Sequence, residues 1–325
     1  RSETADRVVN LLDVLLQRIN AFSTTVGREQ LIRDAIAHHL ACAEAVVRDY
    51  RAMRRTVREV DMSLRFMAEG HPEHKETFDE VIALGDWLID DNFVFMAAFR
   101  FNRDLQRTHQ LGLARFEGSP LETHPEAALG PDAQLVSIAQ TRIDSPVHRD
   151  ARLQEIVVRL HDEDGQPDGG IVFQGLFTYA AITAASSNVP VLRMRLQRMV
   201  ETEDLVPRSH RMKLFLAFFN RLPLTYTFVA SDTEIRGLIN EAIDVDFGGV
   251  PRLHSYAYAD RNVAHVFVLV NRDRFGDKLR WRVQEVIAQA YQADHAEFRL
   301  LGGKTDASLW HYLLSSDTGL ADPDV

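Results

Sequence analysis

The chain has 325 residues, of which 46% are hydrophobic and 26% charged, and its formal net charge is −10. This length is enough for two or three domains, and the acidic balance argues against nucleic acid as the main partner because phosphates repel a negative surface. No run approaches the about 18 apolar residues of a membrane-spanning helix, and the first residues lack the basic-then-apolar order of a secretory signal. We therefore expect a cytoplasmic protein that binds neither nucleic acid nor membranes.

The chain contains a single cysteine, Cys42. One cysteine excludes a disulfide framework and a zinc site built on thiolates. Because Cys42 lies between two alanines in a helical pattern, we interpret it as a small buried hydrophobe rather than a nucleophile.

Residues 1–75 predict a helical region. Residues 3–22 carry an apolar stripe, and a longer helix follows over 28–68 with an apolar seam at spacings of 3 and 4. The seam consists of Ile32, Ile36, His39, Ala43, Val46, Tyr50, Met53, Val57, Val60, Leu64 and Met67. Its partner is either the first helix, folded back, or the same helix of a second subunit. Since the first helix covers only half the seam, we expect part of it to meet another chain or domain.

Residues 76–223 predict an antiparallel α+β domain. A helix over 74–91 is followed by strand-like runs at 93–101, 111–117, 134–141, 153–161 and 170–178. Turn residues at 162–169 predict a hairpin between the last two runs. Strands that follow one another without helical crossovers indicate an antiparallel sheet, which helices near 189–203 and 209–221 would close.

Residues 224–315 predict a βαββαβ domain, and 316–325 a polar tail. The predicted elements are a strand at 225–230, a helix that Ser231 and Glu234 open as a capping box, strands at 253–259 and 263–270, a helix at 277–291, a strand at 297–301 and a further strand at 309–314. This order is the split βαβ arrangement of ferredoxin-like domains. The expected fold class is therefore α+β.

Several polar stretches are candidate sites. Arg142, His148, Arg149 and Arg152 form a local basic stretch that could hold a carboxylate or an acidic residue of a partner. Ser145, His148 and Asp150 lie in one extended segment and cannot supply the converging geometry of a catalytic triad.

Two further patterns also fail as sites. His71 and His74 are three residues apart, whereas two metal-binding histidines on one helical face need a spacing of four. The Gly302–Thr305 stretch has Phe298 where a phosphate loop needs its first glycine. We assign no catalytic residues, no metal ligands and no cofactor to this segment.

The sequence resembles the N-terminal, non-catalytic part of the large NAD-specific glutamate dehydrogenases of bacteria. The resemblance rests on Trp87–Phe95, Ser145–Arg149, Phe173–Ala181, Pro190–Arg193, Ser209-His210 with Lys213, and Asn271–Phe275, in that order. It departs from the family at Arg211-Met212, where Asp-Gly is usual, so a divergent paralogue stays open.

The resemblance implies a parent enzyme that deaminates L-glutamate oxidatively to 2-oxoglutarate with NAD, and whose catalytic domain lies beyond Val325. It implies ACT-type and PAS-like regulatory domains, a homo-oligomer, and contacts with the enzyme's own catalytic domain. An amino-acid effector would bind at the loop of Ala230, Ser231, Asp232 and Thr233. The alternative is a stand-alone sensor or scaffold for amino acids or other small ligands, built from the same modules.

Overall fold

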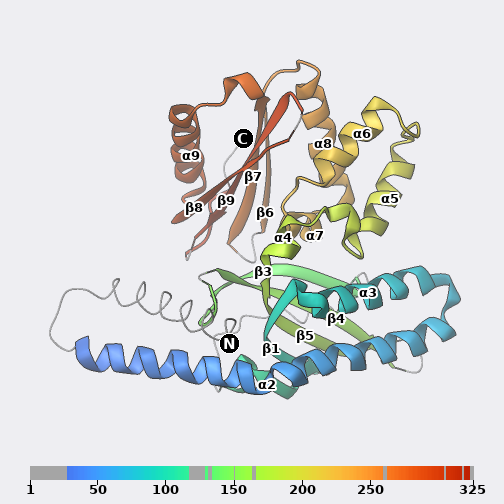
Figure 1. Cartoon of the computed structure of the whole chain (residues 1–325), viewed down its shortest axis with the longest axis vertical. Coiled ribbons are helices and arrows are strands. Elements are labelled where there is room, and N and C mark those ends of the chain that lie inside the picture. Colours follow the sequence, from blue (N-terminus) through green and yellow to red (C-terminus); the bar gives the residue numbers. More distant parts are fainter. Residues whose placement is uncertain are drawn as a thin grey trace, which may run out of the picture. The chain divides into compact units, whose positions relative to one another are not determined.

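The computed structural model describes residues 28–116, 129–130, 134–149, 151–162, 166–258, 262–303, 305–316 and 318–322. The chain divides into two compact units, with the boundary in the sequence between Ala181 and Ile182. Figure 1 shows the elements of each unit. Each unit contains one antiparallel sheet, so the α+β fold class is confirmed. The helix expected over 3–22 lies outside the described residues.

Unit 1 is built on a five-stranded sheet. Its strands are β1 (Phe93–Phe101), β2 (Arg107–Gly112), β3 (Val136–Asp144), β4 (Arg152–His161) and β5 (Pro167–Phe177). Their order is β2-β1-β5-β4-β3, with every neighbouring pair antiparallel. The predicted β4–β5 hairpin is confirmed by the pairing of His161 with Pro167.

The second strand ends earlier than the expected 111–117. Gly112 has a φ of +60°, a left-handed conformation that suits glycine, and the chain turns into a short 3₁₀ helix at Leu113–Arg115. Buried Asp49 holds this turn, since it accepts the Gly112 N–H at 2.8 Å and pairs with the Arg115 guanidinium. Burial works to raise the pKa of Asp49, but these two partners lower it overall.

Two helices cover the sheet of unit 1. The long helix α2 (Arg28–Gly70) contacts α3 (Lys75–Trp87), β1 and β2. Every seam residue from Ile36 to Met67 is buried or half-buried in the structure. The expectation that part of the seam meets another domain is therefore confirmed, because α2 packs against β1 and β2 of the sheet as well as against α3. Contact of the seam with another chain stays a prediction.

A buried carboxyl group lies between α2 and α3. Burial and the neighbouring Asp86 raise the pKa of Asp61 to about 6, which Arg58 offsets only in part. The packing is tight, because a Cβ added to Gly85 of α3 would lie 2.8 Å from Asp61 Oδ1.

Replacing Asp61 by asparagine is expected to stabilise unit 1 at neutral pH. The folded state binds the Asp61 proton more tightly than the unfolded chain, so the charged form costs stability as the pH rises from about 4 to 6. A pKa shift of this size corresponds to about 2–3 kcal/mol in the free energy of unfolding. Urea unfolding at pH 7.5 and pH 4 measures this difference. The free energy of unfolding of the variant should exceed that of the parent protein at pH 7.5 and not at pH 4. An equal gain at both values would contradict this explanation.

Unit 2 carries a four-stranded sheet between helices. The elements are α5 (Leu192–Thr202), α6 (His210–Phe219), α7 (Leu224–Val229), α8 (Asp232–Asp246), β6 (Arg252–Tyr258), β7 (Val263–Asn271), α9 (Asp277–Tyr291), β8 (His295–Leu301) and β9 (Ala307–Ser315). A short helix, α4 (Tyr179–Thr183), spans the boundary between the units. Helices α5 and α6 both contact α8, so the residues expected to close the first sheet lie in unit 2.

The first strand of the expected βαββαβ domain is wrong. Residues 225–230 were expected to be extended because they are rich in β-branched and aromatic types. Instead Pro223 precedes the helix α7, and the Thr227 N–H and hydroxyl both bind the Pro223 carbonyl. Burial of Leu224, Tyr226 and Thr227 outweighs their local propensity.

The last strand, β9, occupies the central position that the expected first strand would have had, between β7 and β8. The sheet order is β6-β7-β9-β8, all antiparallel. A split βαβ sheet has the same spatial order, but there the central strand comes first in the chain. Helices α8 and α9 lie on opposite faces of this sheet (Figure 1). On the α9 face, Ile287 and Tyr291 pack against a cluster that includes Val266, Trp310 and Tyr312.

Candidate functional site

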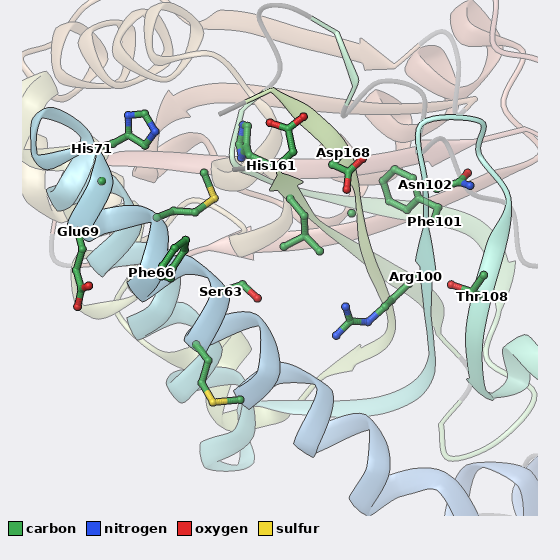
Figure 2. A pocket seen from close by; sticks show the side chains of 16 residues that line it. Ser63, Phe66, Glu69, His71, Arg100, Phe101, Asn102, Thr108, His161 and Asp168 are labelled. Atoms are coloured by element: carbon green, nitrogen blue, oxygen red, sulfur yellow. The ribbon is translucent and has the colours of Figure 1, made fainter. Parts of the chain in front are cut away.

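An open pocket of about 920 Å³ lies in unit 1 at the C-terminal end of α2. The last turns of α2 form one wall, and the ends of β1, β4 and β5 with part of β2 form the other. Figure 2 shows Ser63 and Phe66 on the helix and Arg100 and Phe101 on the strand side. Its volume is within the range of small-molecule sites.

Apolar side chains form much of the lining. They are Met62, Phe66 and Met67 of α2, Phe101 of β1 and Leu160 of β4. Met62 is 64% exposed and Phe66 71% exposed, which is unusual for large apolar side chains on one helix face. They lie off the buried seam of α2, so the fold of unit 1 does not need them.

Three charged groups of the lining, those of Arg100, Asp162 and Asp168, are paired within the protein. Arg100 donates to Glu59 at 3.1 Å, and Arg103 at the rim pairs with both Asp162 and Asp168. Glu69 and His71 complete the polar part beside the end of α2.

His161 lines this pocket and has one ring nitrogen that is closed to solvent. Its Nδ1 is buried and has no hydrogen-bond partner among the described residues. Burial, with a contribution from Arg159, lowers the pKa of His161, so the ring is neutral at neutral pH. A neutral imidazole can either accept or donate a hydrogen bond. The pocket therefore combines an apolar wall with charged groups, which suits a small molecule with an apolar body.

Three of the four residues of the expected effector loop, Ala230, Ser231 and Asp232, are engaged by the protein itself. Ser231 and Glu234 form the predicted capping box, with Ser231 Oγ accepting the Glu234 N–H at 3.2 Å. Arg195 of α5 donates to the Ala230 carbonyl at 2.6 Å and pairs with the Asp232 carboxylate at 2.6 Å. Thr233 follows on the exposed side of the helix start. Effector binding at this loop stays a prediction, and a ligand there would have to share it with Arg195.

The basic stretch is spread over the end of the unit 1 sheet. Arg149 donates to the Phe177 carbonyl at 2.7 Å and thereby holds the end of β5. Arg152 donates to the Arg142 carbonyl at 3.4 Å across β3 and β4, while His148 is exposed with a φ of +76°. A carboxylate-binding role for these four residues stays a prediction.

A buried imidazole pair lies in unit 2, on the sheet face opposite α9. His265 of β7 and His311 of β9 are joined by a 2.9 Å hydrogen bond between Nδ1 and Nε2, with the rings stacked. Burial lowers the pKa of His265 to about 3 and that of His311 well below its usual value. Tyr226 of α7 packs against His265. Sequence reasoning missed this pair, because only strand pairing brings positions 265 and 311 together.

Metal binding and membrane insertion find no support in the described part of the chain. No three histidine, cysteine, aspartate or glutamate side chains there are grouped closely enough to hold a metal ion. None of its helices combines the length and the apolar character needed to cross a bilayer. Cys42 is buried, as expected.

The chain is similar to three NAD-specific glutamate dehydrogenases. It is 25% identical to that of Halomonas elongata over 235 residues, which is 67% of this chain and 15% of the enzyme. The Mycobacterium tuberculosis enzyme is 24% identical over 85% of this chain, and the Pseudomonas aeruginosa enzyme 21% identical over 84%. The chain spans only 15–18% of these curated relatives. No family model matches it. The similarity to a segment of the large NAD-specific glutamate dehydrogenase family, expected from the motifs, is confirmed.

Proposed function

We propose that this chain is a regulatory and assembly segment of an NAD-dependent glutamate dehydrogenase whose catalytic domain lies outside it. The observation that carries the proposal is the similarity over 67–85% of the chain to enzymes of which it spans only a small part. The parent enzyme would convert L-glutamate to 2-oxoglutarate, with NAD bound by another part of the polypeptide. The segment would contact its own catalytic domain and a second copy of the subunit.

The architecture of the two units supports a sensing role to different extents. The order β2-β1-β5-β4-β3 of unit 1 is the order of the sheet in PAS sensor domains. Unit 2 shares only its spatial strand order with ACT-type domains, because its central strand is the last in the chain. The pocket beside α2 is a place where a regulatory molecule could bind. A stand-alone sensor has less support, since each of the three relatives is an enzyme.

The parent enzyme, with and without residues 1–325, tests the proposal. The isolated chain is expected to produce no NADH from glutamate and NAD, because the proposed catalytic domain is not part of it. Deleting the segment from the complete enzyme should change the subunit number by light scattering, or the dependence of the rate on added amino acids. The proposal fails if the isolated chain turns over glutamate, or if the deletion alters neither assembly nor regulation.

A further inference from the structure

We propose that the pocket at the C-terminal end of α2 binds an organic cation with an apolar body, such as a primary amine carried on an aromatic ring. This goes beyond the proposed function and does not depend on it, since it rests on the pocket alone. Two features of the lining carry the inference: its exposed apolar wall and its charge.

The wall on α2 offers contact surface that the fold leaves uncovered. Phe66 is exposed on the pocket side of the helix, and Phe101 lies across from it (Figure 2). Met62 is a second exposed apolar residue of the lining. Aromatic faces attract ammonium groups by cation–π interaction, and methionine side chains adapt to ligands of different shape. An apolar ring with a positive group suits this wall better than a fully polar molecule.

The charges of the lining disfavour anions. Four carboxylates lie in or beside the described lining, those of Glu59, Glu69, Asp162 and Asp168, and they outnumber the two guanidinium groups that pair with them, those of Arg100 and Arg103. Arg100 already pairs with Glu59, so an incoming carboxylate or phosphate would have to displace that partner. Helix α2 also ends here without a basic residue in its last turn, which leaves the negative end of its dipole beside the pocket.

A series of indoles that differ in charge tests the proposal on the intact 325-residue chain. Tryptamine is a cation, indole is neutral and indole-3-acetate is an anion, while the ring stays the same. Calorimetric titration in low salt should rank their affinities in that order, with tryptamine about 10-fold tighter than indole-3-acetate. Added salt should narrow the difference, because it screens the partly exposed charges.

Two helix variants locate the binding. Phe66→Ala should weaken tryptamine about 5-fold, because the aromatic face is lost. The matched control is Val47→Ala, since Val47 is also on α2 and 71% exposed but lies outside the lining. Met62→Ala serves as a second pocket variant, and circular dichroism checks that all three fold. The inference is overturned if tryptamine does not bind, if indole-3-acetate binds as tightly, or if the pocket variants behave like the control.

Discussion

Replacing both Val57 and Val60 by aspartate is expected to unfold unit 1. The two side chains are 3% and 4% exposed, and α2 packs there against α3 and the sheet. Each substitution places a carboxylate where neither water nor a cation can reach it, and such changes typically cost more than about 4 kcal/mol. Circular dichroism and hydrogen exchange should show loss of the α2 and sheet signals.

The control for this experiment lies on the same helix. Val47→Asp introduces the same charge at an exposed position and should leave unit 1 folded. If the double variant stayed folded and only its mass by light scattering fell, the seam would join subunits after all, and the packing described for α2 would be incorrect.

Acidification is expected to destabilise unit 2 through His265 and His311. Both imidazoles are buried, and their pKa values lie below the usual 6.5. The groups facing them are Tyr226 of α7, Tyr256 of β6 and Arg299 of β8, of which Arg299 further disfavours protonation.

The direction of the change in stability follows from the number of protons that the folded and unfolded states bind. Below about pH 6.5 the unfolded chain takes up protons that folded unit 2 does not, so its stability falls as the pH decreases toward about 3. The loss is about 1.4 kcal/mol for each pH unit and each imidazole, or about 4 kcal/mol between pH 6.5 and pH 5.

Tryptophan fluorescence can follow unit 2 alone. In a Trp87→Phe background the remaining tryptophans, Trp281 and buried Trp310, both belong to unit 2. Urea unfolding between pH 5 and pH 8 should show the loss below pH 6.5. A variant with both histidines replaced by phenylalanine should show a flatter profile. If the free energy of unfolding fell with the same slope below pH 6.5 with and without the two histidines, the acid sensitivity would belong to other groups.

The features best predicted from the sequence are those set by residues that lie close together in the chain. The seam of α2, the capping box at Ser231 and the β4–β5 hairpin all follow from spacing and turn chemistry, and the structure contains them. The failure at 225–230 has a different cause: a composition typical of strands was overruled by burial of Tyr226 in the core of unit 2.

The candidate pocket could not be predicted, because its residues come from one helix and four strands. The sequence gives one faint signal. Met62 and Phe66 are large apolar residues on α2 that do not fit its buried seam. Large apolar residues that lie outside the packing face of a helix indicate a possible binding surface.

The position of β9 has a consequence for how the polypeptide is made. This strand pairs with both β7 and β8, yet it is the last strand of the unit. While a ribosome is still elongating the chain, β7 and β8 therefore have no central neighbour, and their inner edges stay open until Ser315 has left the exit tunnel. The sheet of unit 2 therefore cannot close before β9 has been synthesised. Until then, chaperones that shield unpaired strands would be needed most.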